Sequence, residues 1–185
     1  MSKIRKTTQY LMPVSKKKPG ALDYDIYPVH DLGDGTVSSD FSELAARIPE
    51  RGTVIIDGYV GVRFDEFVSS LNEALSAVGK TALWWSVDSA LKSPAEIDKM
   101  IEPFLGGDDP LFGYRASLEL KDFFDGDKLA SIKADASAPL NIIYGIGASL
   151  AGWEGTLIYL DIPKNEIQFR SRAGSVRNLG AAAPD

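Results

Sequence analysis

The chain has 185 residues, of which 44% are hydrophobic and 25% charged, and it contains no cysteine. This size and composition fit a single globular domain. The lack of cysteine excludes disulfides, thiolate metal sites and a cysteine nucleophile. The sole histidine, His30, excludes a multi-histidine metal site within this chain. No apolar run approaches the ~18 residues of a membrane span, so we expect a cytoplasmic protein without a membrane partner.

Charge is distributed unevenly along the chain. Residues 1–20 carry six basic and no acidic side chains, whereas the remaining 165 residues carry 14 basic and 26 acidic ones. An acidic body of this kind repels phosphate backbones, so we expect no nucleic-acid partner. We interpret residues 1–21 as a flexible basic arm, either solvated or lying on the acidic body, and residues 22–185 as one domain.

The first predicted elements follow a turn-rich stretch, DLGDGT, at 31–36. Apolar residues at helical spacing predict a short helix at 40–48, which Pro49 ends. The continuous apolar run TVIID at 53–57 ends in an acid, as in a buried parallel strand that delivers a carboxylate to the edge of a sheet. An amphipathic helix is predicted at 63–78, so strand, glycine turn and helix form half of a βαβ unit.

A second strand, TALWWSV at 81–87, precedes a helix at 93–104. The start of this helix, SPAE, has the serine, proline and glutamate of a capping box. The stretch LGGDDPLFGYR at 105–115 has too many turn formers for regular structure and is typical of a loop at a site. Short helices are predicted at 118–124 and 127–133.

Two more strands, LNIIY at 140–144 and TLIYLDI at 156–162, and a final helix that begins at Pro163 complete the pattern. Strands alternate with helices throughout the chain. This alternation predicts the α/β class, a three-layer α/β/α arrangement with a mainly parallel sheet. In such folds ligands bind at the carboxyl ends of the strands.

The turn DGYVGVRFD, 57–65, lies where P-loop proteins bind phosphate. Their pattern is GxxxxGK[ST], and counting from Gly58 its last three positions hold Arg63, a phenylalanine and Asp65. The acid places negative charge where a helix N-terminus should receive an anion, whereas the arginine could grip a phosphate. Two interpretations stay open: a structural turn, and an anion-binding loop that includes Gly61.

Two other clusters carry candidate ligand-binding side chains. In the loop GGDDP, Asp109 could serve a magnesium, general-base or sugar-hydroxyl site, or could only cap a turn. Nearby, Arg115 could clamp a phosphate or pair with a loop acid. In the predicted final helix, Arg170, Arg172 and Arg177 form a basic cluster that either complements the helix dipole or forms an anion-binding lid. The glycines at 145–148 match a dinucleotide loop poorly, because its third glycine is missing.

These segments resemble known families. The strand end IIDG, the loop GGDDPLFGYR and the unit LIYLDIPKNEIQFRSRAG resemble the uridine-kinase-like branch of P-loop kinases, in which a YLD-plus-helix unit supplies lid arginines. More closely, IIDGYVGVRFDEF, FLGGDDPLFGYR and YLDIPKNEIQFRSRAGSVRNLG resemble the N-terminal region of long bacterial proteins described as class I mannose-6-phosphate isomerases. The likeness covers about residues 22–180.

The resemblance implies a P-loop kinase-like fold, a phosphate-facing loop at 58–65, and lid arginines at Arg170 and Arg172. The isomerase reaction would belong to a downstream cupin domain that holds zinc, in the same or a companion chain. This chain supplies no such ligands, so we expect it to bind no metal and no cofactor of its own.

Three functions are therefore considered. The first is a non-catalytic kinase-like module that binds a sugar phosphate or a nucleotide in carbohydrate metabolism. The second is an active small-molecule kinase in which Arg63 replaces the lysine, Asp65 helps to hold magnesium, and Asp57 or Asp109 is the base. The third is a structural or homo-oligomerisation domain. The residues expected at the ligand are Gly58, Gly61, Arg63, Asp57, Asp109, Arg115, Arg170 and Arg172.

Overall fold

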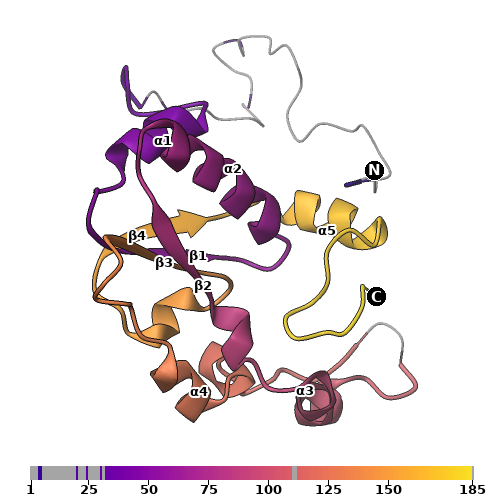
Figure 1. The fold of residues 1–185 in the computed structure, drawn as a ribbon. Helices are drawn as coiled ribbons and strands as arrows, with labels where there is room; N and C mark the ends of the chain where they lie inside the picture. Colours follow the sequence, from indigo (N-terminus) through magenta and orange to yellow (C-terminus); the bar gives the residue numbers. More distant parts are fainter. Residues whose placement is uncertain are drawn as a thin grey trace.

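The structure, a computed structural model, describes residues 4–5, 20, 24, 30, 32–109 and 112–184. Most of the expected basic arm, 1–21, therefore lies outside the described residues. Four parallel strands form the central sheet, in the order β2-β3-β1-β4 (Figure 1). The strands are β1 (Gly52–Gly58), β2 (Ala82–Ser86), β3 (Leu140–Tyr144) and β4 (Thr156–Leu160).

The register brings the carboxyl ends of the strands to one edge of the sheet. Ile56 of β1 pairs with Tyr144 of β3, and Gly58 pairs with Leu160 of β4. The turns that follow β1, β2 and β3 therefore start close together, although the first turn begins at residue 59 and β3 ends 85 positions later, at Tyr144. This edge is where open parallel sheets bind their ligands.

The described residues form five α-helices and short 3-10 turns, of which α1 precedes the first strand and α5 follows the last. The helices are α1 (Phe41–Arg47), α2 (Phe64–Ala77), α3 (Pro94–Ile101), α4 (Gly126–Ser131) and α5 (Lys164–Arg172). Helix α1 begins where the Asp40 carboxylate accepts from the Ser42 and Glu43 amides. Helix α3 begins with the predicted capping box, in which Ser93 and Glu96 bond each other's backbone amides. Both helix starts confirm the sequence prediction.

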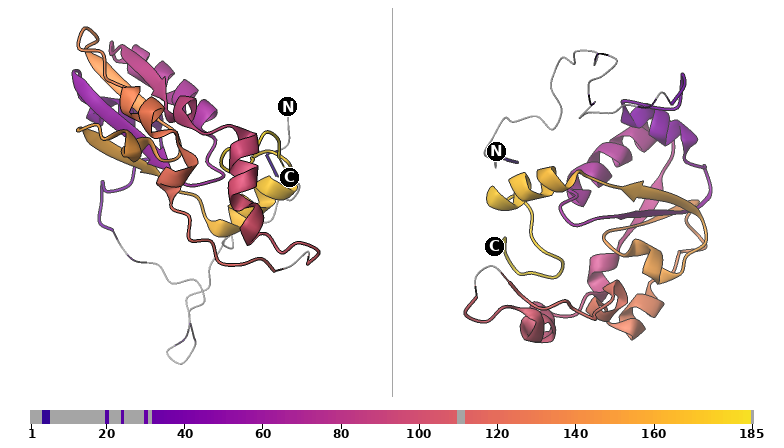
Figure 2. Two further views of the ribbon diagram at one scale, coloured as in Figure 1. Left: turned by 90° about the horizontal axis from the view of Figure 1, so that it is seen from below. Right: turned by 180° about the vertical axis from the view of Figure 1, so that it is seen from behind.

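Apolar side chains cover both faces of the sheet. Helices α1 and α2 pack on the face that presents Val54 and Ile56, and α4 with two 3-10 turns packs on the face of Ile55 and Ile143 (Figure 2). Because consecutive β1 residues are buried on opposite faces, the strand reads as a continuous apolar run. The predicted α/β class with helices on both faces is confirmed.

One segment differs from the sequence prediction, and the path of the chain after α5 was not predicted. The segment 118–124 forms only a 3-10 turn, Leu120–Phe123, because Glu119 and Asp122 each accept from the other's backbone amide and close a single turn. After α5, the chain crosses the space between α5 and α3 and ends there (Figure 1).

Across the described residues, no helix combines the length and the apolar character needed to span a bilayer.

Candidate functional site

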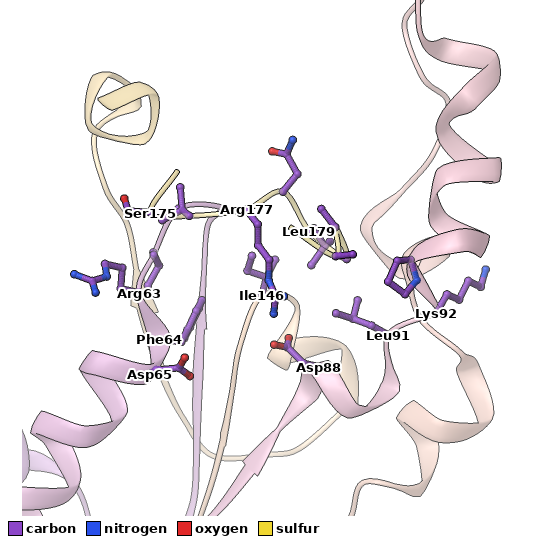
Figure 3. A pocket seen from close by; sticks show the side chains of 18 of the residues that line it. Arg63, Phe64, Asp65, Asp88, Leu91, Lys92, Ile146, Ser175, Arg177 and Leu179 are labelled. Carbon is purple, nitrogen blue, oxygen red and sulfur yellow. The ribbon is translucent and has the colours of Figure 1, made fainter. Parts of the chain in front are cut away.

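A cleft of about 610 Å³ lies at the carboxyl end of the sheet (Figure 3). Three segments line it: the glycine loop with the start of α2 (61–66), the end of β2 with the start of α3 (88–94), and the C-terminal segment 175–182. Ile146, from the turn after β3, also lines the cleft and lies beside Arg177. This volume is within the range of small-molecule sites.

The glycine loop joins β1 to α2 as in the P-loop arrangement of strand, loop and helix. Gly58 must lack a side chain, since a Cβ there would lie 2.6 Å from the Leu160 carbonyl oxygen. Gly61 has φ of +91°, a conformation that favours glycine. Helix α2 begins after Arg63, and the side chain of this N-cap residue does not bond the first amides of the helix. These amides border the cleft and attract negative charge.

Arg63 lies at the rim of the cleft. Its Nη2 forms an ion pair with Glu66, while its Nη1 is buried and has no hydrogen-bond partner among the described residues. The guanidinium points away from Asp88 and Arg177, toward the side of the glycine loop that faces α5 (Figure 3). On that side Arg63 and Arg170 line a second hollow of about 500 Å³. Arg63 is thus near the first amides of α2 but is not directed to the centre of the cleft.

Asp57 performs a different task from the one expected. It is 7% exposed, and its Oδ1 accepts from the Gly58 and Gly147 amides at 2.7 and 2.8 Å. Its Oδ2 accepts from the Ser149 amide at 3.0 Å and the Ser149 hydroxyl at 2.5 Å. A carboxylate offers about four acceptor positions, and these four bonds occupy them. Asp57 therefore fixes the turn after β3, and its carboxylate has no acceptor position left for a sugar hydroxyl or a substrate proton.

Asp88 and Arg177 occupy the centre of the cleft. The sequence prediction did not include Asp88, and it named Arg177 only as a member of the basic cluster of the final helix. Asp88 follows β2, and its side chain faces Arg177 from the opposite wall (Figure 3). Desolvation by the surrounding wall raises the pKa of Asp88, Arg177 opposes this rise by attraction, and Asp65 adds to it by repulsion. Arg177 forms no hydrogen bond or ion pair within the part of the chain that the structure describes.

The sequence held a signal for Asp88. Like Asp57 it is an acid placed at the end of an apolar strand, in WWSVD, so the same rule would have found it. Arg177 belongs to the basic cluster of the C-terminal region, but spacing alone did not separate it from Arg170 and Arg172. Only the fold shows that the chain turns back after α5 and brings Arg177 over the sheet.

The remaining predicted residues lie elsewhere. Asp109 and Arg115 are exposed in the loop after α3, where Asp109 Oδ1 accepts from the Phe112 amide at 3.2 Å, and neither residue lines the cleft. Arg172 is exposed on α5 outside the cleft. Arg170 Nη1 donates to the Gly61 carbonyl at 2.8 Å, and its Nε donates to Glu166. The structure thus brings Gly61 and Arg63 to the cleft, but not Asp109, Arg115 or Arg172.

The described residues contain no group of three or more histidine, cysteine, aspartate or glutamate side chains arranged to hold a metal ion. Fold and site together define an α/β protein with a glycine loop between β1 and α2 and a mixed-charge cleft beside it. The chain belongs to the family described as Domain of unknown function (DUF8485), whose model matches residues 40–185.

A comparison with curated proteins found no match. Among solved structures, the chain is similar to a candidate fructose transport system kinase from Silicibacter sp. TM1040, with 17% sequence identity and a TM-score of 0.48. The similarity covers 72% of this chain and 80% of that chain. At this identity and TM-score, the similarity says nothing about the function of this chain.

Proposed function

We propose that this chain binds a small phosphorylated molecule, a sugar phosphate or a nucleotide, in the cleft at the carboxyl end of the sheet. One observation carries the proposal: two groups that bind anions meet in one cleft. They are the first amides of α2, which the N-cap side chain of Arg63 does not bond, and the guanidinium of Arg177, which has no hydrogen-bond or ion-pair partner among the described residues. Helix amides and arginine both form charge-assisted hydrogen bonds to phosphate, and Arg63 adds positive charge at the rim.

Binding without phosphoryl transfer fits the residues of the loop. A P-loop lysine and hydroxyl hold the phosphates and magnesium, but their positions here are occupied by Phe64 and Asp65. Their loss removes two groups that stabilise charge in the transition state of phosphoryl transfer. A kinase-like module that binds and does not react is the proposal that follows.

Mannose 6-phosphate is the first ligand to test. The support for it is the resemblance of three long segments to the N-terminal region of class I mannose-6-phosphate isomerases. The same resemblance supports a cupin isomerase domain, in the same or a companion chain, as the partner. Zinc and the isomerase reaction would then belong to that partner domain.

Replacing Arg177 tests the proposal. Isothermal titration of the full chain with mannose 6-phosphate, fructose 6-phosphate and ATP, with and without magnesium, identifies the ligand. Loss of a charge-assisted hydrogen bond in Arg177→Ala should weaken binding of that ligand roughly tenfold or more. Arg172→Ala removes the same charge from an exposed position outside the cleft and should change little. Equal losses in both variants, or no binding of any of the ligands, would contradict the proposal.

Asp88 favours one alternative, an active small-molecule kinase. Asp57 and Asp109 do not suit the role of base, because the first is fully bonded and the second lies outside the cleft. Asp88 has a raised pKa and lies in the cleft, as a general base should. Magnesium-dependent ATP turnover with a sugar acceptor that Asp88→Asn abolishes would establish this alternative over simple binding.

A further inference from the structure

Two described residues near the start of the chain, Ile4 and Arg5, contact α5 and the segment after it, of which the second lines the cleft. Arg5 Nη1 donates to Glu166 Oε2 on α5 at 2.7 Å, and the guanidinium lies 4.8 Å from the centre of the Phe169 ring. The carbonyl of Ile4 accepts from the Ser175 hydroxyl at 2.5 Å. Two adjacent residues near the start of the chain therefore bind α5 and the segment that follows it.

A chain of charged hydrogen bonds continues from Arg5 to the glycine loop. Glu166 Oε1 accepts from Arg170 Nε at 3.1 Å, and Arg170 Nη1 donates to the Gly61 carbonyl at 2.8 Å. The side chains of Arg5, Glu166 and Arg170 are 24%, 12% and 18% exposed. Because they are largely shielded from water, these contacts contribute more than ion pairs on an open surface do.

The last bond in this chain fixes the peptide between Gly61 and Val62. Its carbonyl binds Arg170, and its N–H donates to the Tyr59 carbonyl at 3.3 Å. The loop also lies tightly against α5, since a Cβ on Gly61 would be 3.1 Å from Ile162 and 3.3 Å from Ile167. The orientation of this peptide determines how the chain enters α2, and hence where the first amides of α2 point.

The Ile4 contact acts on the other wall of the cleft. Ser175, which binds the Ile4 carbonyl through its hydroxyl, is also held by its own N–H, which donates to the Arg170 carbonyl at 3.0 Å. Arg177 follows two residues later. The N-terminal segment thus fixes the point from which the chain carries Arg177 across the sheet.

We propose that Ile4 and Arg5 form a positioning clamp for the cleft. Arg5 acts through Glu166 and Arg170 on the glycine loop, and Ile4 acts through Ser175 on the segment that carries Arg177. Arg170 is then a positioning residue, which replaces its expected role as an anion-binding lid arginine. The effect of the clamp on ligand affinity rests on the proposed function, whereas its effect on the two walls holds without any ligand.

Hydrogen exchange of the ligand-free full chain tests the clamp. Arg5→Ala should accelerate amide exchange roughly tenfold at 59–66, because a charge-assisted hydrogen bond restrains the opening of this loop, and Ser175→Ala, which removes the hydroxyl that binds the Ile4 carbonyl, should accelerate exchange at 175–178. Exchange in β3 should stay unchanged, and Arg47→Ala, which removes an exposed arginine from α1, should have no effect at either wall. Unchanged exchange at 59–66 in Arg5→Ala, or at 175–178 in Ser175→Ala, would overturn the proposal.

A double variant tests the path through Glu166. If Arg5 acts on the glycine loop through Glu166, then Arg5→Ala combined with Glu166→Gln should accelerate exchange at 59–66 no more than Glu166→Gln alone. Additive effects would overturn this path. With mannose 6-phosphate as the probe, Arg5→Ala should also lower affinity several-fold although it contacts no ligand. Faster exchange in Arg5→Ala, together with no binding of mannose 6-phosphate, fructose 6-phosphate or ATP by the unaltered chain, would uphold the clamp and reject the proposed function.

Discussion

Asp57 shows how one carboxylate can join two distant parts of the chain. It lies at the end of β1, and it accepts two backbone amides and a hydroxyl from residues 147–149, about ninety positions later. The sequence predicted its place at the carboxyl edge of the sheet correctly. Its contacts could not be predicted, because a strand-ending acid looks the same whether its oxygens face a ligand or a neighbouring turn. The pairing of β1 with β3 shows that the Asp57 oxygens face the neighbouring turn, because it brings residues 147–149 next to Asp57.

Replacing Asp57 should therefore destabilise the fold. In Asp57→Asn, an amide NH₂ faces the donors of Gly147 or Ser149, which leaves buried N–H groups without acceptors. We expect the free energy of unfolding to fall by about 2–4 kcal/mol, measured by urea denaturation at pH 7. Asp108→Asn, the same change at an exposed loop position, is the control. A loss as small as that of the control would show that the four hydrogen bonds contribute little.

The segment 175–182 is an element without regular structure that nevertheless depends on close packing. Gly180 has φ of +74°, and a Cβ there would lie 2.2 Å from Ile97 Cδ1 on α3. Ile97 is only 2% exposed, so it has little room to move away. The segment therefore holds its place over the cleft partly because position 180 carries no side chain.

Gly180→Ala should displace this segment, whereas Gly152→Ala should not. Gly152 has a similar φ of +68° but open space around it, so both variants carry the backbone strain of about 1 kcal/mol and only one carries the steric clash. We expect faster hydrogen exchange at 175–182 and weaker binding of the phosphorylated ligand in Gly180→Ala alone. Matching exchange in the two variants would indicate that Ile97 absorbs the contact.

Most elements could be predicted from the sequence, because their signals are local. The capping box of α3, the apolar run of β1 and the stripe of α2 each depend on neighbouring residues. The prediction of a helix at 118–124 was wrong, because polar side chains of this segment bond its own backbone and end the helical structure after one turn. The path of the chain after α5 could not be predicted, since it depends on packing against α3, about eighty residues earlier.

At the scale of the whole molecule, strand order decides which candidate residues meet. The order β2-β3-β1-β4 places the turns after β1, β2 and β3 around one cleft, and the loop at 105–115 is excluded from it. Asp109 and Arg115 were therefore expected at a site that they do not line, while Asp88 was missed. No spacing in the sequence encodes this order, which arises from the burial of both sheet faces.

The stability of the whole molecule should depend on Asp88 in a way that pH reveals. Desolvation raises the pKa of Asp88 above its ordinary value of 3.8, so the folded state holds this proton more tightly than the unfolded state does. Stability is therefore lost as the pH rises from about 3.8 through the raised pKa, and the cost is complete above it.

Asp88→Asn removes this cost and should unfold at higher urea than the unaltered chain at pH 7, with the difference vanishing near pH 3. Asp98→Asn, an exposed change on α3, should show no such trend. If Asp88→Asn were instead less stable at pH 7, attraction to Arg177 would outweigh desolvation, and the two side chains would be an ion pair that holds the cleft together.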